Sequence, residues 1–144
     1  MKNIDEFPVQ VRVQVAYVDM GPANHVNNAN YFRYFEDARA KYFVEAGISE
    51  MYSKAGIGAL LAELKCKFVQ SLVYPDNLLV GVRVPSVGQT SFIMEYLIVS
   101  EKVGVAATGE GIQVMYDYNK SQKTSVPEEI RTAIEKLETR YQVI

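Results

Sequence analysis

Apolar residues recur along the first third of the chain with two different periods. Over residues 9–18 they alternate with polar residues, which predicts a half-buried strand. Over residues 29–46 they recur three and four positions apart with no Gly or Pro, which predicts a long helix. Gly47 follows in the position that favours a left-handed C-terminal cap. Because apolar residues cover most of this helix, the rest of the chain is expected to wrap around it.

The remaining chain has the pattern of strands followed by a second amphipathic helix. Extended runs rich in Val, Ile, Phe and Tyr are separated by turns, and they cover residues 59–73, 78–84, 90–100 and 105–118. Four long strands in succession favour a meandering antiparallel sheet. Gly109 and Gly111 in the last run indicate a bulge or a close backbone approach. An apolar stripe predicts a C-terminal helix over about residues 125–139, packed on the outside.

This order of elements predicts an α+β fold in which a curved antiparallel sheet wraps around one long central helix. With 144 residues and no internal repeat or linker, residues 1–144 are expected to form a single domain. Long edge strands would stay exposed in such a sheet. Pairing of these edges between copies is the obvious remedy, so we expect a homo-oligomer.

Composition and charge narrow the classes of partner and cofactor. A net charge of -2 argues against a nucleic-acid partner, whose phosphates call for a basic face. One His and one Cys cannot make the usual zinc site, so no metal is expected. The N-terminus lacks the apolar core of a signal peptide, and no stretch is long enough to span a membrane. We therefore expect a soluble, cytoplasmic protein without a membrane partner.

The loop before the long helix carries the residues with recognisable chemistry. Asp19 is followed by the run His25-Val26-Asn27-Asn28 and by Tyr31, and the helix continues with Glu36-Asp37-Ala38-Arg39. This pattern resembles the hotdog-fold acyl-CoA thioesterases of the 4-hydroxybenzoyl-CoA thioesterase family, whose motif is Asp-x-Asp-x-x-Gly-His-Val-Asn-Asn-x-x-Tyr followed by Glu-x-Ala-Arg. The resemblance covers roughly residues 8–120 and implies the hotdog fold.

Hydrolysis of a thioester needs a group that polarises the carbonyl and a carboxylate that activates water or attacks the carbon. The free N–H groups and positive dipole end of the long helix suit the first task. The resemblance makes Asp19 and His25 the candidate catalytic residues, with Val26, Asn27, Asn28 and Tyr31 as candidate substrate-binding residues. Structural roles are open for several of them: Asp19 as a loop cap, the two Asn as helix caps, and Tyr31 as a core residue.

One position departs from the family pattern. The usual catalytic carboxylate is the second Asp of Asp-x-Asp, four residues before the His, and Gly21 stands there in this chain. Asp19 matches the first Asp. Two residues of extended chain span about 6.5 Å, whereas a general base must come within about 3 Å of its proton donor. Either Asp19 acts in place of the missing carboxylate, or the usual mechanism has been lost.

The resemblance implies an acyl-CoA thioesterase that releases a carboxylic acid and free CoA, in a homodimer or homotetramer with active sites at subunit interfaces. No cofactor is needed beyond the coenzyme A of the substrate, and an acyl-carrier protein thioester is an alternative substrate. A non-catalytic hotdog protein that binds an acyl thioester, with Gly21 in place of the carboxylate, is the rival hypothesis. A hydratase or dehydratase fits the motif less well. Cys66 shares an apolar face with its neighbours, which favours a buried inert thiol over a nucleophile.

Overall fold

The computed structural model describes residues 3–139, and these form one curled antiparallel sheet with helices on one face. The helical elements in chain order are η1 (Ile4–Glu6), η2 (Tyr17–Asp19), α1 (Asn28–Glu45), α2 (Ile48–Ala55) and α3 (Glu128–Thr139). The strands are β1 (Val9–Gln14), β2 (Ile57–Phe68), β3 (Asn77–Val87), β4 (Ser91–Ser100), β5 (Gly104–Asp117) and β6 (Gln122–Lys123).

The strand order differs from a simple meander. Strands β3, β4 and β5 follow one another as predicted, but the full order is β1-β3-β4-β5-β2, with the short β6 beside β5. The chain therefore leaves β1 at one edge, runs through α1 and α2, and enters β2 at the other edge. The sheet cannot be a meander throughout, because the helices carry the chain across its whole width between β1 and β2.

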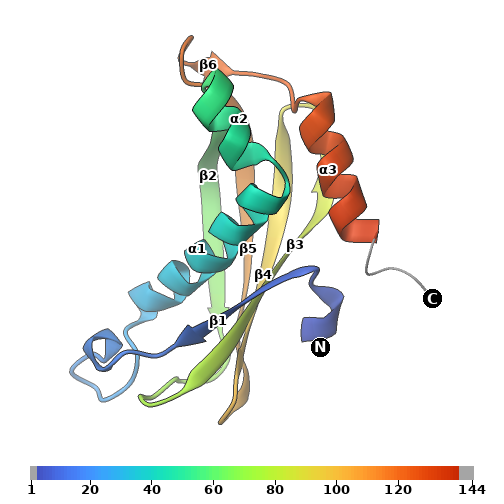
Figure 1. Ribbon diagram of the computed structural model, residues 1–144. Helices are drawn as coiled ribbons and strands as arrows, with labels where there is room; N and C mark the ends of the chain where they lie inside the picture. Colours follow the sequence, from blue (N-terminus) through green and yellow to red (C-terminus); the bar gives the residue numbers. More distant parts are fainter. Residues whose placement is uncertain (1–2, 140–144) are drawn as a thin grey trace.

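Helix α1 runs obliquely across the concave face of the sheet, as Figure 1 shows. It packs mainly on β1 and β3. Asn27 caps its N-terminus, and Gly47 adopts a left-handed φ of 79° after its C-terminus, as predicted. One side of the helix is uncovered, because Asp37, Lys41 and Val44 are all exposed. The predicted central helix is confirmed, although the single chain does not enclose it.

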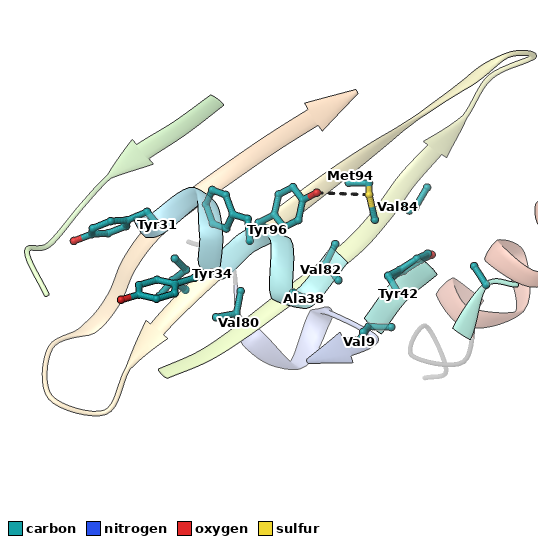
Figure 2. Close-up of a cluster of buried hydrophobic side chains, with 14 of the residues drawn as sticks. Val9, Tyr31, Tyr34, Ala38, Tyr42, Val80, Val82, Val84, Met94 and Tyr96 are labelled. Carbon is teal, nitrogen blue, oxygen red and sulfur yellow. Dashed lines mark hydrogen bonds between the residues drawn. The ribbon is translucent and has the colours of Figure 1, made fainter. Parts of the chain in front are cut away.

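The core lies between α1 and the strands beneath it (Figure 2). Tyr34, Phe35, Ala38 and Tyr42 are fully buried along α1. They meet side chains from the concave face of the sheet, namely Val80, Val82 and Val84 of β3 with Met94 and Tyr96 of β4. Burial of each large side chain contributes about 1.5–3 kcal/mol, so α1 is the main organiser of the core.

The alternatives predicted for Gly109 and Gly111, a bulge or a close backbone approach, are decided by the register of β5. The register shifts along β5 lie at Ala62 in β2 and at Ala106 in β5, and not at either glycine. Gly109 marks a close approach instead: a Cβ at this position would lie 2.5 Å from the ring of Phe35. A side chain on Gly109 would therefore push α1 away from the sheet.

The C-terminal helix α3 lies on the same face as α1 (Figure 1). Its buried stripe consists of Ile130, Ile134 and Leu137. Glu138 binds the last turn of α3 to α1 and β3. The Tyr42 hydroxyl donates to Oε2 of Glu138 at 2.5 Å, and the Val84 N–H donates to the same oxygen at 3.1 Å. Burial raises the pKa of the Glu138 carboxyl above its usual value, against the effect of these two donors.

Candidate active site at the N-terminus of α1

The carboxylate of Asp19 is buried and fully engaged. Asp19 is 3% exposed, and its Oδ1 lies 2.6 Å from Nη2 of Arg33. Its Oδ2 accepts hydrogen bonds from the Tyr34 hydroxyl at 2.8 Å and from the Ala16 N–H at 2.9 Å. Burial and the neighbouring carboxylate together raise the pKa of Tyr34, which keeps the phenol protonated as a donor. The carboxylate thus faces the side of α1 and not the solvent.

The backbone of Asp19 holds the start of α1 as well. Its carbonyl accepts the Asn27 N–H at 2.9 Å and Nδ2 of Asn30 at 3.0 Å. Met20 and Val26 form a single antiparallel bridge that closes the loop between them. Asp19 also donates its N–H to the Ala16 carbonyl at 2.9 Å, so it joins η2, the loop and the first two turns of α1 through six hydrogen bonds.

His25 lies at the other side of the same loop and is partly exposed. Its Nδ1 is 3.0 Å from the carbonyl oxygen of Val26. When Nδ1 carries the proton and donates to this carbonyl, Nε2 presents a lone pair to a water or substrate. None of the described contacts of the Asp19 carboxylate is with His25, so the two candidate catalytic side chains are not paired.

The N-terminus of α1 keeps one backbone donor free. Oδ1 of Asn27 accepts the Ala29 N–H at 3.0 Å, and the Asn27 carbonyl accepts the Asn30 N–H at 2.9 Å, so Asn27 is the N-cap. Within residues 3–139, the N–H of Asn28 has no hydrogen-bond partner, and this residue is exposed. Together with the positive end of the helix dipole, the Asn28 N–H is suited to bind a developing oxyanion.

Val26 and Tyr31 turn inward. Val26 is fully buried, and its N–H donates to the carbonyl of Leu72 at 2.8 Å. The Tyr31 hydroxyl donates to the Gln70 carbonyl at 3.0 Å and accepts the Leu72 N–H at 3.2 Å. Both residues therefore anchor the segment after β2. The ring of Tyr31 packs edge-on against Phe68, with 4.9 Å between the ring centres, and only this ring lies toward the exposed end of β2.

Gly21 leaves a small open space beside the helix terminus. A Cβ built at this position would lie 3.7 Å from the His25 carbonyl oxygen and 3.9 Å from Nδ2 of Asn27, which are ordinary contacts. The backbone there is not left-handed, so a side chain is compatible with it. The position occupied by the family's usual carboxylate is thus vacant but sterically available.

Sequence reasoning missed the two residues that bind Asp19. Arg33 belongs to the polar side of the helix by its spacing, and Tyr34 carries no distinguishing pattern. Both residues lie one turn after Asn30 on the helix. Helical spacing gives the direction of their side chains, but it does not identify Asp19, which lies across the loop, as their partner.

Membrane-spanning helices and metal clusters are both absent from the part of the chain that the structure describes. No helix among residues 3–139 has the length and apolarity of a membrane-spanning segment. In the same range, no three His, Cys, Asp or Glu side chains gather in a way that could hold a metal ion.

Comparisons with known proteins place the chain in a family. The model of the thioesterase-like superfamily matches residues 11–134. A thioesterase of Thermus thermophilus, solved with coenzyme A and Zn, is 32% identical with a TM-score of 0.83, and the match covers 94% of this chain and 97% of that one. An Aquifex aeolicus (strain VF5) protein provisionally named as an esterase is 28% identical over 102 residues, which is 69% of this chain and 78% of that protein.

A DHNA-CoA thioesterase of Staphylococcus aureus shares the fold at 18% identity, with a TM-score of 0.81 and coverage of 94% of this chain and 96% of that one. The predicted hotdog architecture and the predicted thioester hydrolase class are confirmed by the family match and the Thermus structure. The chain belongs to the thioesterase-like superfamily.

Proposed function

We propose that the chain hydrolyses an acyl-CoA thioester at the N-terminus of α1, with the Asn28 N–H binding the carbonyl oxygen. The observation that supports this most directly is the N–H of Asn28, an exposed residue at the first position of the helix, which has no hydrogen-bond partner among the described residues. Water adds to the carbonyl carbon, the C–S bond breaks, and the proton from water ends on the CoA thiol. The N–H and the helix dipole stabilise the negative charge that forms on the oxygen between these steps.

His25 is the side chain best placed to handle the proton in this proposal. The 3.0 Å contact of Nδ1 with the Val26 carbonyl fixes the ring and directs the proton to Nδ1. Nε2 then accepts a proton from the attacking water and returns it to the leaving thiolate. A general base of this kind contributes about 100- to 10,000-fold in rate.

Asp19 acts in this proposal as a positioning residue. Both of its carboxylate oxygens are already bound, by Arg33 on one side and by Tyr34 and Ala16 on the other. Its carbonyl binds the N-cap residue Asn27. Asp19 thereby fixes the orientation of the helix N-terminus on which the oxyanion donor lies.

Replacement of Asn28 by Pro tests the oxyanion donor directly. Pro is favoured at the first position of a helix, and the preceding Asn27 has the extended conformation (φ -61°, ψ 135°) that a residue before Pro requires. The substitution therefore removes one N–H and leaves the helix in place. We expect kcat for acyl-CoA hydrolysis, followed by release of free thiol, to fall about 100- to 1000-fold with little change in Tm.

Asn28→Ala is the matched control, because it removes the side chain and keeps the N–H. It should retain kcat within a few-fold, whereas His25→Gln should lower kcat by at least tenfold. Equal activity of the Pro and Ala variants would refute the role of this N–H. Absence of turnover by the natural chain across a panel of aliphatic and aromatic acyl-CoAs would refute the proposed function.

Coenzyme A is the carrier we propose. The Thermus relative was solved with coenzyme A, and the match covers nearly the whole of both chains. An acyl-carrier protein remains the alternative carrier, and turnover of the same acyl group on both carriers decides between them. A cytoplasmic location stays a prediction.

The assembly we propose is a homodimer joined along β2. This strand of 12 residues forms one edge of the sheet, and Leu60, Leu61 and Phe68 on it are each more than 40% exposed. Continuous pairing of two β2 strands would cover this edge. Leu61→Lys should then shift the mass measured by light scattering toward the monomer, whereas Arg12→Glu on the opposite edge strand should not. A homotetramer made of two such dimers would give twice the dimer mass.

A further inference from the structure

A carboxylate is buried where the end of β1, the start of β3 and the turn from β4 into β5 meet, at the lower end of the sheet in Figure 1. It belongs to Asp76, which directly precedes β3 and is 7% exposed. Its Oδ2 accepts a hydrogen bond from the Ser100 hydroxyl. That hydroxyl accepts the N–H groups of Lys102 and Val103, each at 3.0 Å. The Asp76 carbonyl accepts the Val15 N–H at 3.0 Å, so this residue joins the three segments.

The other oxygen of this carboxylate is an acceptor without a donor. Among residues 3–139, Oδ1 of Asp76 is fully buried and has no hydrogen-bond partner. A buried polar oxygen that has lost its water and gained no donor is costly, and a charged one more so. Native proteins rarely keep such a group without a reason. The carboxylate therefore needs a further hydrogen-bond donor, and a cationic donor offsets the burial of its charge best.

Asp76 lines a cleft of about 390 Å³, a volume suited to a small molecule. Of the residues around this cleft, Asp76 and Val15 alone are buried, so these two form its floor. The remaining lining residues, Tyr74 and Glu101 among them, are exposed. Because exposed side chains alone surround the floor, their rotation opens a path from the solvent to Asp76.

The chemistry of the cleft selects one kind of cation. The carboxylates of Asp76 and Glu101 and the ammonium of Lys102 leave its lining with a net charge of -1. A metal ion is disfavoured, because no cluster of three His, Cys, Asp or Glu side chains that could hold one occurs among the described residues. A guanidinium pairs with both oxygens of a carboxylate, and Oδ2 is already bound to Ser100. One free oxygen suits a primary ammonium, which acts as a compact point charge.

We propose that this cleft binds a small free alkylamine in its ammonium form, with the ammonium on Oδ1 of Asp76. An ammonium has three N–H donors, and the side-chain amide oxygens of Gln14 and Asn77 in the same lining are acceptors for the other two. Tyr74 and Pro75 line the cleft as well and provide apolar surface for a short alkyl chain. None of the residues proposed to act in hydrolysis is among the described lining residues, so this inference goes beyond the proposed function.

The test measures Tm and backbone amide chemical shifts with n-butylamine at neutral pH, where a primary amine is protonated. N-butylacetamide is the matched control ligand, because it has the same alkyl chain and no charge. We expect n-butylamine to raise Tm as its concentration rises and to shift the amide signals of Val15 and Lys102. N-butylacetamide should do neither, and methylguanidinium should bind more weakly than n-butylamine.

Variants of the charged lining residues assign the contact. Asp76→Asn keeps an acceptor for Ser100 and removes the charge, so it should weaken the binding of n-butylamine by at least about tenfold. Glu101→Gln should weaken it less, and Lys102→Met should strengthen it, because that variant removes a competing ammonium. Asp37→Asn, at an exposed carboxylate on α1, should leave the affinity unchanged. Should Asp76→Asn fail to fold, the opposite effects of the two exposed positions carry the test.

Several results would overturn the inference. Equal effects of n-butylamine and N-butylacetamide, or equal affinity of the natural chain and Asp76→Asn, are expected if a buried water donates to Oδ1. A loss of stability in Lys102→Met, with no binding of n-butylamine to the natural chain, would identify Lys102 as the donor. A larger Tm shift with Nα-acetyl-lysine amide than with n-butylamine would replace the free amine by a lysine side chain of a partner. These readouts need no catalysis, so they stand whether or not the chain hydrolyses thioesters.

Discussion

Nη2 of Arg33 lies 2.6 Å from Oδ1 of Asp19, and this ion pair joins a half-exposed guanidinium to a carboxylate that is only 3% exposed. This contact makes Asp19 a structural centre of the loop. We predict that Asp19→Asn lowers the free energy of unfolding by about 1–3 kcal/mol, because it weakens charge-assisted hydrogen bonds to a buried group. Urea unfolding of the two proteins measures this change.

The same variant separates the two roles that Asp19 could have. A positioning role predicts that kcat of Asp19→Asn stays within about tenfold of the natural value at a temperature where both proteins are folded. Asp37→Asn, at an exposed carboxylate on the same helix, is the control for both stability and rate. A 100- to 10,000-fold loss of kcat with unchanged stability would instead make Asp19 the general base.

Glu138 should make stability depend on pH. Burial raises the pKa of this carboxyl in the folded state above its ordinary value of 4.5. The resulting stabilisation is present at low pH and is lost as the pH rises from about 4.5 through the raised folded-state pKa. We predict that Glu138→Gln, which keeps an acceptor for Tyr42 and Val84, gains stability relative to the natural chain over this rise in pH.

Thermal unfolding between acidic and neutral pH tests this prediction. Glu135→Gln, at an exposed position of α3, should follow the pH dependence of the natural chain. Glu138→Ala should be less stable than the Gln variant by about 1–3 kcal/mol, because it leaves the Tyr42 hydroxyl and the Val84 N–H without their acceptor. Parallel curves for the natural chain and Glu138→Gln would contradict the assignment.

Local rules predicted the elements well where a single residue determines the backbone. Gly47 ends the long helix because only Gly takes its left-handed φ easily, and Asn27 caps α1 because its side chain reaches the N–H of Ala29. Both effects lie within one turn of chain. They need no knowledge of distant contacts.

Distant contacts decided what the sequence did not reveal. Nothing in the alternation of β2 distinguishes pairing with β3 from the observed pairing with β5, because a strand's pattern gives its buried face and not its neighbour. The partners of Asp19 could not be predicted for the same reason. Arg33 lies fourteen residues away along the chain, and only the path of the loop brings the two residues together. The resemblance supplied the candidate location of the site, and the geometry changed the proposed role of Asp19 from a base to a positioning residue.

Cys66 should be a poorly reactive thiol. Burial raises its pKa to about 11, so at pH 8 the thiolate fraction is roughly 100-fold below that of an ordinary cysteine. We predict slow alkylation by iodoacetamide at pH 8 that accelerates steadily as the pH approaches this value. The same chain in urea is the control and should react at the rate of a free cysteine. Rapid labelling of the folded chain at pH 8 would revive the hypothesis of a nucleophilic thiol.

Gly21→Asp restores a carboxylate at the position that the family motif assigns to it. The new Cβ would make only ordinary contacts, at 3.7 Å from the His25 carbonyl and 3.9 Å from Nδ2 of Asn27. A carboxylate beside the N-terminus of α1 is favoured by the helix dipole, so stability should change by less than about 1 kcal/mol. We predict that kcat for acyl-CoA hydrolysis rises at least tenfold, since a second base adds to the oxyanion donor at Asn28. Gly21→Asn has the same shape without the charge and should show no gain. If the Asp and Asn variants have equal activity, the vacant position is not adjacent to the reacting water, and proton transfer at this site does not pass through residue 21.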